Sequence, residues 1–352
     1  MDVADLTEGR VVAYDLDAFA ALNPDARRPF FEEAAAHRGL VMPIIEKDFW
    51  VVWSLHVLFD LPDRDAFVFK GGTSLSKAFG LIERFSEDID LVLDRARFGF
   101  AGAADVTQAT SGEQRRRRRE QLDAMVATYL REDLVPRLTR IARATSGVVV
   151  EIDGNDPLSI LVRYPAAEPD HPYVRPVVKI ETGGRADSWP TVDRPIHAYV
   201  ALEFPQAFEN DEVTVKTIEA RRTFLEKLTI LHKTAHAFDA EQPVAIAERF
   251  SRHYYDVYRM SLQETEDVAL LDGDLLVAVR TAAQAFFPQT KAKYEEFQVG
   301  SIRIVPPPRG VEALARDYIA MKDMFFGEAP PFEAILEVLA ELERRVNAVA
   351  QQ

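Results

Sequence analysis

Cysteine is absent from this sequence of 352 residues. Its absence excludes disulfide bonds, thiolate metal sites and cysteine nucleophiles, so any chemistry must rely on carboxylates, hydroxyls, amines or imidazoles. Long hydrophobic runs are missing as well, since no stretch reaches the ~18 uninterrupted apolar residues that a membrane span requires. The first residues, Met1 to Asp5, lack the basic start of a secretory signal. We therefore expect a cytoplasmic protein without a membrane partner.

Positive charge is scarce too. The formal net charge of -15 argues against non-specific binding of nucleic acid over the whole surface, because phosphate binding depends on clustered cations. The exception is the segment 101–150, where nine arginines stand against six acidic residues. Five of them are consecutive, and we expect them in a mobile loop over residues 100–120. They are candidates for a local RNA contact that adds affinity without sequence choice: Arg115, Arg116, Arg117, Arg118 and Arg119.

Hydrophobic residues make up 47% of the chain and charged residues 28%, the composition of a globular protein. The order of elements predicts an α+β fold, with a mixed sheet and its flanking helices in residues 1–217 and a mostly helical part in residues 218–352. The apolar patterns predict helices over 24–37, 43–58, 73–79, 120–144 and 332–348, and strands over 66–70, 88–93, 147–152, 159–164, 175–181, 196–202 and 213–217.

The run from Phe69 to Lys77 is the strongest local feature. It contains a strand end, the double glycine Gly71-Gly72 that forces a turn, and a helix start with Thr73 as the expected N-cap. Such a corner exposes backbone N–H groups where a phosphate binds well. It is not a Walker A loop, because Ser76 stands where that pattern needs glycine. Taken alone, a double glycine is more often just a turn.

A second feature, Asp88-Ile89-Asp90, follows soon after this corner. Positions two apart face the same side of a strand, so Asp88 and Asp90 present two carboxylates from one surface. Like charges placed in this way repel unless a cation is supplied, and Mg²⁺ is usually held by one or two carboxylates together with substrate phosphates. The alternative is that the two aspartates only mark a strand end in solvent. It is the weaker interpretation because they follow directly after a turn and helix start that could bind phosphate.

Other chemistries find little support. His232 and His236 have a spacing that can bind zinc, but no third ligand is apparent and Lys233 would oppose a cation. No Gly-x-Ser-x-Gly elbow and no protein-kinase motif set is present.

These motifs resemble a known family. Gly71-Gly72-Thr73-Ser74 followed by Asp88-x-Asp90 is similar to the signature of the polymerase-beta-like nucleotidyltransferase superfamily. The fuller pattern resembles its AbiEii/AbiGii toxin branch, with further matches in the expected order at Glu46-Lys47-Asp48-Phe49-Trp50, Arg84-x-Ser86, Glu226-Lys227-Leu228 and Tyr254-Tyr255-Asp256-Val257-Tyr258. His253 departs from the branch, which commonly has Arg-Asp before these tyrosines and so a salt-bridge partner there.

The resemblance implies a polymerase-beta-like fold whose helical part contributes to the active-site cleft. It implies Mg²⁺ at Asp88 and Asp90, with Glu181 as our candidate third carboxylate, and Lys227 beside the triphosphate. Asp256 would orient Lys227, position the acceptor or act as general base, and Ser86 would touch phosphate or accept a nucleotide itself. The implied nucleotide-binding residues are Lys70, Gly71, Gly72, Thr73, Ser74 and Lys77.

The function implied by the resemblance is Mg²⁺-dependent transfer of a nucleoside monophosphate from an NTP to RNA, most of all to the 3′ end of tRNA. The protein would be the toxin of a toxin–antitoxin system with a cognate antitoxin, acting in abortive infection and phage defence. Two alternatives stay open: transfer to a protein hydroxyl on the antitoxin or on Ser86, and a non-catalytic nucleotide-binding module.

Overall fold

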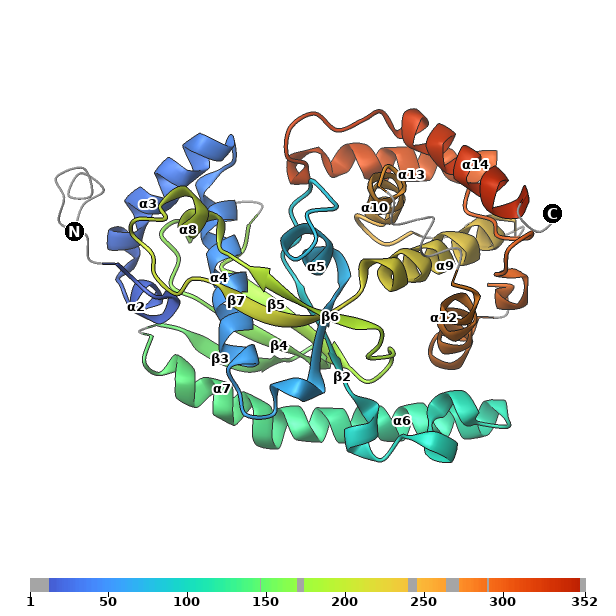
Figure 1. Ribbon diagram of the computed structural model, residues 1–352, viewed down its shortest axis with the longest axis horizontal. Coiled ribbons are helices and arrows are strands. Elements are labelled where there is room, and N and C mark those ends of the chain that lie inside the picture. The colour runs from blue at the N-terminus through green and yellow to red at the C-terminus, as the bar shows by residue number, and fades with distance from the viewer. Residues whose placement is uncertain are drawn as a thin grey trace.

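The computed structural model describes residues 13–145, 147–169, 174–239, 246–263, 272–289 and 291–348, so the expectation drawn from Met1 to Asp5 lies outside the described residues. Seven strands form one mixed sheet in the order β3-β4-β5-β2-β1-β7-β6 (Figure 1). β1 pairs in parallel with β7 and β2 with β5, whereas the other neighbours are antiparallel. The strands are β1 (Phe67–Lys70), β2 (Ile89–Leu93), β3 (Val149–Asp153), β4 (Asp156–Arg163), β5 (Val177–Gly183), β6 (Thr191–Ile196) and β7 (Val213–Ile218).

Helices flank this sheet and then make up most of the chain after β7, so the predicted α+β fold is confirmed. They are α2 (Leu16–Ala20), α3 (Pro24–Arg38), α4 (Met42–Phe59), α5 (Gly71–Lys77), α6 (Gly112–Tyr129), α7 (Val135–Ala142), α8 (Tyr199–Glu203), α9 (Ala220–Phe238), α10 (Arg252–Ser261), α12 (Gly273–Phe286), α13 (Pro308–Ala320) and α14 (Phe332–Ala348).

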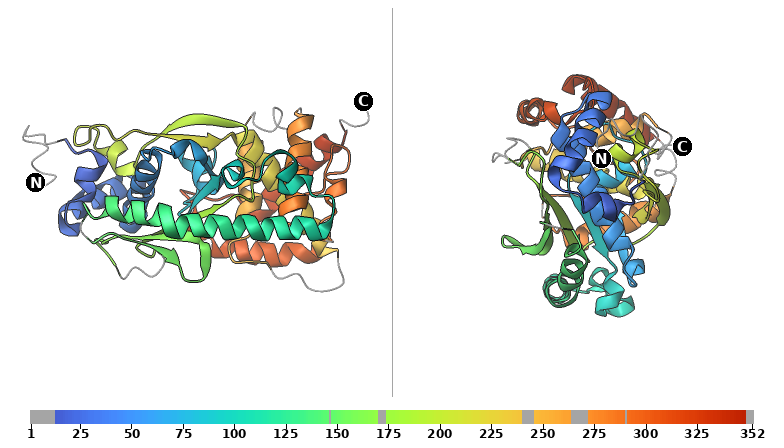
Figure 2. Two further views of the ribbon diagram at one scale, coloured as in Figure 1. Left: turned by 90° about the horizontal axis from the view of Figure 1, so that it is seen from below. Right: turned by 90° about the vertical axis from the view of Figure 1, so that its left-hand side faces the viewer.

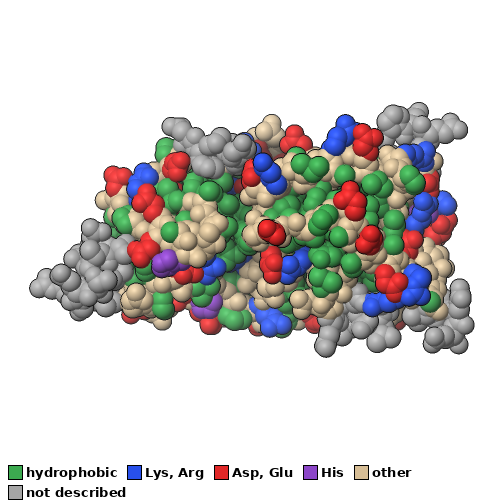
Figure 3. Space-filling model, turned by 90° about the horizontal axis from the view of Figure 1, so that it is seen from above, with side chains coloured by type: hydrophobic (Ala, Val, Ile, Leu, Met, Phe, Trp, Pro, Cys, Tyr) green, Lys and Arg blue, Asp and Glu red, His purple; other side chains and the backbone are tan. Residues whose placement is uncertain are grey.

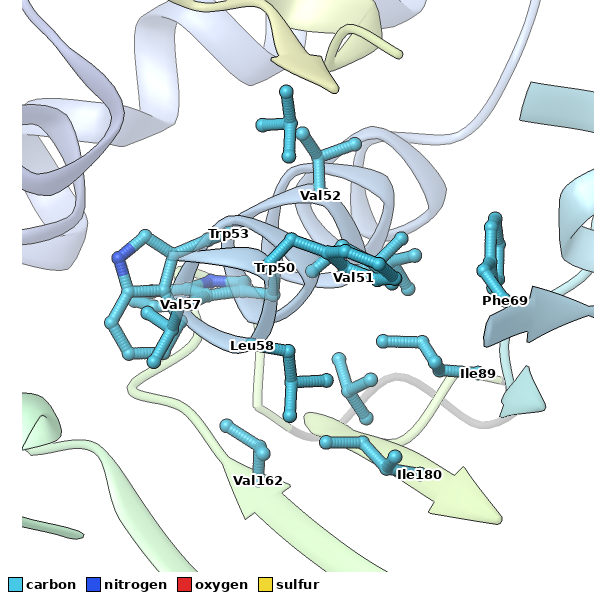
Figure 4. Packing of buried hydrophobic residues seen from close by; sticks show 14 of the residues in the cluster. Trp50, Val51, Val52, Trp53, Val57, Leu58, Phe69, Ile89, Val162 and Ile180 are labelled. Carbon is cyan, nitrogen blue, oxygen red and sulfur yellow. The ribbon is translucent and has the colours of Figure 1, made fainter. Parts of the chain in front are cut away.

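α4 is the central helix of the sheet half. Nearly all of its residues are buried, which is the expected environment of a helix that is apolar on every side. Figure 4 shows Trp50, Val51 and Leu58 of this helix packed over side chains from the strands, and the Trp50 ring stacks on Tyr164 with centroids 5.1 Å apart. α4 therefore packs against the buried face of the sheet. Ile180, the neighbour of Glu181 on β5, belongs to the same hydrophobic core.

A long rod lies along one side of the molecule and consists of α6, a π-helical segment at Leu130–Leu134 and α7 (Figure 2, left). Its buried side chains recur every four residues: Leu122, Val126, Leu130, Leu134 and Leu138. A stripe with that period drifts around a helix of 3.6 residues per turn, and the wider π-helical turns bring it back toward the core.

The expectation of a loop at the arginine run is wrong. Arg115 to Arg119 lie inside α6, which begins at Gly112 with Ser111 as its N-cap. The Gln114 N–H donates to the Ser111 hydroxyl at 3.1 Å, and Glu113 adds negative charge in the first turn. Arginine is a good helix former, so this cap is sufficient to start the helix before the charged run.

A second difference concerns the segment 196–202, which we expected to be a strand. The structure ends β6 at Ile196 and forms the short helix α8 from Tyr199 to Glu203 instead. A short apolar run fits a buried strand or a buried helix equally well, and here Val200, Ala201 and Phe204 bury with helical spacing.

The second half has its own hydrophobic cluster, formed by α9, α10, α13 and α14 together with Leu75 of α5. The sheet cluster in turn takes in Ala282, Ala285 and Phe286 of α12. Each half thus lends side chains to the other, and the division at residues 217/218 stays a prediction. No helix among the described residues is both long and apolar enough to cross a membrane.

Candidate active site

The junction of β1 and α5 has two glycines in very close contact with their neighbours. Gly71 has a φ of 80°, and a Cβ atom on it would lie 1.8 Å from Oδ2 of Asp90. A Cβ atom on Gly72 would lie 2.8 Å from both the Ser86 hydroxyl and an Nη atom of Arg84. The double glycine therefore lets the backbone approach the aspartate strand more closely than any side chain permits.

The next two hydroxyls, predicted to bind phosphate, are buried and used within the protein. The Thr73 hydroxyl donates to the backbone carbonyl of Asp88 at 2.5 Å, and the Ser74 hydroxyl donates to the carbonyl of Gly71 at 2.9 Å. α5 begins at Gly71, so the expectation that Thr73 caps this helix is wrong. These contacts hold the corner against the start of β2.

The carboxylates of Asp88 and Asp90 repel each other, and no described side chain forms a hydrogen bond or ion pair with either. Asp90 lies in register with Glu181 on the neighbouring parallel strand. Burial and the charges of Glu181 and Asp88 raise the pKa of Asp90 to about 6, against the opposing charge of Lys70. Burial is also the main cause that raises the pKa of Asp88.

This arrangement fits a divalent cation that is shared with substrate phosphates. Unpartnered carboxylates with raised pKa values gain most from a cation, and Mg²⁺ needs only one or two of them when phosphates complete its ligands. Among the described residues, no three His, Asp or Glu side chains come close enough to hold a metal by themselves. Glu181 is half exposed and accepts a hydrogen bond from Lys179 at 2.7 Å. It lies beside Asp90 on the neighbouring strand.

Of the two histidines at helical spacing, His232 has a structural role. The His232 Nδ1 accepts from the Arg303 N–H at 3.1 Å, and its Nε2 lies 3.1 Å from the Lys293 carbonyl. Both ring nitrogens are therefore occupied by the backbone, and burial is the main cause that lowers the pKa of His232 to about 4. A neutral ring held in this way leaves no nitrogen for zinc.

Asp256 lies at the centre of a buried ionic cluster. Arg84 donates to both of its oxygens at 2.7 Å, and the Lys227 Nζ donates to Oδ2 at 2.7 Å. Burial alone would raise the pKa of Asp256, but the two cations hold it well below its usual range. A fully buried carboxylate with both oxygens in ion pairs is suited to orienting Lys227 and unsuited to taking a proton.

Lys70 is held by a second chain of charges. Its Nζ donates to Glu226 Oε2 at 2.7 Å, and Arg222 donates through Nε to Glu226 Oε1 at 3.1 Å. Arg222 also donates to Asp187 at 2.7 Å. Glu226 and Lys227 are neighbours on α9. One turn of this helix therefore supplies both the carboxylate that holds Lys70 and the lysine that pairs with Asp256.

Two pockets meet at Asp90. The first, which we call the glycine pocket, has a volume of about 270 Å³ and is lined on one side by Gly71, Gly72, Ser86 and Asp88. The second, the α12 pocket, has a volume of about 590 Å³ and opens toward α12. Residues that line both pockets are Lys70, Asp90, Glu181, Glu226 and Ile230.

The glycine pocket also contains residues that sequence reasoning missed. Arg249, Arg252 and His253 line its other side, beside the predicted Lys227. Arg252 makes no side-chain hydrogen bond or ion pair with any described residue, and the buried His253 Nδ1 has no hydrogen-bond partner there either. Sequence position alone carries no signal for these side chains, because they reach the aspartates only through the fold of the helical half.

Lys77, predicted to bind nucleotide, lies elsewhere. Its Nζ donates to Asp48 Oδ1 of α4 at 2.7 Å and lies 3.7 Å from the centroid of the Tyr199 ring. Both partners of this ion pair are almost completely buried. Lys77 lines neither pocket and ties α5 to α4.

The five arginines of α6 have different partners. Arg116 pairs with Glu113 and Glu120, Arg118 donates to the Asp105 carbonyl at 2.6 Å, and Arg119 donates to the Ala285 carbonyl at 3.2 Å. Arg115 and Arg117 form no ion pair with a described residue. The face shown in Figure 3 is the one opposite α6, and there Lys and Arg are interspersed with Asp and Glu in place of a continuous basic surface.

Comparison with known families gives the class of this protein, which is a nucleotidyltransferase. The family described as nucleotidyl transferase AbiEii toxin, type IV toxin–antitoxin system, matches residues 55–338. The chain belongs to this family, which confirms the resemblance seen in the motifs and makes it a nucleotidyltransferase toxin with an NTP substrate and an antitoxin partner.

Among solved structures, the chain is similar to MenT4, a nucleotidyltransferase toxin from Mycobacterium tuberculosis. The two share 16% sequence identity and a TM-score of 0.38, over 91% of this chain and 97% of that chain. No curated protein matches the sequence.

Proposed function

We propose that this toxin transfers a nucleoside monophosphate from an NTP to an RNA acceptor, with the 3′ end of tRNA as the favoured acceptor and Mg²⁺ as the metal. The acceptor hydroxyl attacks the α-phosphorus, a new P–O bond forms, the bond to the β-phosphate oxygen breaks, and pyrophosphate leaves. The observation that carries the proposal is the meeting of two pockets at the unpartnered carboxylate of Asp90, with Asp88 beside it in the glycine pocket.

In this proposal the triphosphate occupies the glycine pocket. The backbone of Gly71 and Gly72 forms one wall, Ser86 lies beside it, and Lys227 and Arg252 face it from the helical half. Lys227 is oriented by Asp256, and a fixed cation beside the phosphates stabilises the charge that develops on the leaving pyrophosphate. This placement makes the predicted helical domain, residues 218–352, one wall of the active site.

Asp88 and Asp90 would hold the metal, and a divalent cation at this position would supply charge neutralisation for the transferring phosphoryl group. Glu181 would raise the affinity of the pair by its negative charge, and Lys70, held by Glu226, would limit the repulsion when no cation is bound. Thr73 and Ser74 support this arrangement through the backbone of the corner, and Lys77 supports it by its ion pair with Asp48 of α4.

A second candidate acceptor is Ser86. Its hydroxyl lies in the glycine pocket, next to Gly72 and 2.9 Å from the Thr73 hydroxyl, within the space assigned to phosphate. Transfer to Ser86 would add one nucleotide to the protein itself.

The test is incubation of the protein with total RNA, Mg²⁺ and each labelled NTP in turn, with label read separately on RNA and protein. Asp90→Asn is the inactive comparison, because the amide keeps the size of the side chain and removes the metal-binding charge. Label on a tRNA-sized band that depends on Asp90 supports the main proposal. Label on the protein that disappears in Ser86→Ala supports the second candidate. Wild-type protein that labels neither in the presence of Mg²⁺ contradicts both.

A further inference from the structure

α9 forms a wall of both pockets and presents a lysine to each. Lys227 lines the glycine pocket, and Lys233 lines the α12 pocket. Six residues of helix separate them by about 9 Å along the axis. The helix therefore places a second cation on the other side of Asp90 from the proposed triphosphate site.

Lys233 differs from the other lysines of the cleft because no described residue forms an ion pair with it. Lys70 is paired with Glu226 and Lys227 with Asp256, whereas the Lys233 ammonium makes no hydrogen bond or ion pair with any described residue. Burial lowers the pKa of Lys233, and no carboxylate opposes this effect. A half-buried, unpaired ammonium in a pocket wall is a ready partner for an anionic group of a ligand.

The mouth of the α12 pocket carries an exposed aromatic ring. Phe287, directly after α12, is 49% exposed although its neighbour Phe286 is buried. The backbone at Phe287 is held in place, because the Tyr294 hydroxyl donates to the Phe287 carbonyl at 2.8 Å. Exposed aromatic rings beside cations are the elements with which proteins bind single-stranded nucleic acid, through base stacking and phosphate contacts.

The α12 pocket continues into a third cavity of about 400 Å³, which we call the α6 cavity. Lys233, Phe287 and Arg185 line both, and Arg116 and Arg119 extend the α6 cavity along the basic helix. The two cavities together run from Asp90 to α6. In the α6 cavity Arg116 and Arg185 are paired with Glu120 and Asp123, whereas Lys233 and Arg119 form no ion pair with a described residue. These two cations are available to the backbone phosphates of a strand of several nucleotides.

We propose that the α12 pocket and the α6 cavity bind the single-stranded 3′ end of the acceptor RNA, with a base stacked on Phe287 and a backbone phosphate on Lys233. This inference rests on the proposed function and assigns the two sides of Asp90: triphosphate in the glycine pocket, acceptor strand in the α12 pocket. The arginines of α6 then contact the acceptor further from its end.

The test compares wild-type protein with Phe287→Ala and Lys233→Ala, with Phe287→Tyr and Lys233→Arg as conservative variants. We expect either alanine variant to raise the KM for the RNA acceptor by about tenfold, the effect of losing one base stack or one phosphate contact, while the KM for NTP stays within twofold. The conservative variants should restore the acceptor KM. Lys216→Ala, on β7 away from both pockets, is the matched control for loss of one lysine.

Fluorescence anisotropy with a labelled single-stranded RNA oligonucleotide gives a second readout that needs no turnover. Lys233→Ala should weaken this binding and reduce its salt dependence by about one phosphate contact. Unchanged RNA binding in both alanine variants overturns the inference. A raised KM for NTP with an unchanged acceptor KM also overturns it, because the α12 pocket would then hold the nucleobase of the NTP. Failure of the proposed function is seen separately, as wild-type protein that binds the oligonucleotide and transfers nothing to RNA.

Discussion

The buried cluster of Arg84, Asp256 and Lys227 gives a sharp prediction, because stability and activity should respond differently to its members. The exposed fraction is 3% for the Arg84 side chain, 0% for Asp256 and 7% for Lys227. In Asp256→Asn, two buried cations lose the one carboxylate that pairs with them among the described residues. Removing one partner of a buried ion pair costs about 3–5 kcal/mol, a large part of the 5–15 kcal/mol by which a typical domain is stable.

Lys227→Met is the contrasting change. It removes one cation and leaves both hydrogen bonds from Arg84 to Asp256 intact, and methionine fills a similar volume. We expect this variant to lose about 1.5–3 kcal/mol of stability, the net contribution of one hydrogen bond to a charged group, while its transfer activity falls by about 100-fold or more.

Urea unfolding followed by circular dichroism measures both free energies of unfolding, and single-turnover transfer measures activity in conditions where each variant is folded. If Asp256→Asn unfolds with the wild-type free energy and only loses activity, the cluster is not structural, and Asp256 acts directly on the substrate. If Lys227→Met retains full activity, the proposed position of Lys227 beside the triphosphate is wrong.

Three further predictions follow from single contacts. Gly71→Ala should abolish most activity, because its Cβ atom would displace the Asp90 carboxylate and a shift of about 1 Å costs on the order of 100-fold in rate; near-normal transfer would refute the close approach. Burial is the main cause that raises the pKa of Glu46 to about 7, so the folded state keeps a proton that the unfolded chain releases near pH 4.5. Wild-type stability should therefore fall by about 3 kcal/mol between pH 4.5 and 8, and Glu46→Gln should remove this fall; parallel urea-unfolding curves across that range would contradict the reasoning. Lys77→Met should lower stability and leave the KM for NTP unchanged, because Lys77 is buried against Asp48; a raised KM with unchanged stability would return Lys77 to the nucleotide site.

Much of the local structure was predictable from the sequence. The end of β1, the double glycine and the alternation of Asp88 and Asp90 are properties of a few adjacent residues, so they could be identified before any tertiary contact was known. The final helix has the predicted bounds, Phe332 to Ala348, because its apolar residues repeat regularly over several turns. The predicted loop at the arginine run and the predicted strand over 196–202 were wrong, since in both segments the short-range signals conflict.

What the sequence by itself determined was the set of reactive side chains and their order along the chain, because motif spacing and helical periodicity are local properties. Only the tertiary structure decided which of them act together. Arg84 reaches Asp256 from 172 positions away, and Lys77, six residues from Gly71, faces a different helix altogether. Such partners are chosen by the packing of α9 and α10 against the β1–α5 corner, and the free energy of that packing comes from hydrophobic residues distant from the site.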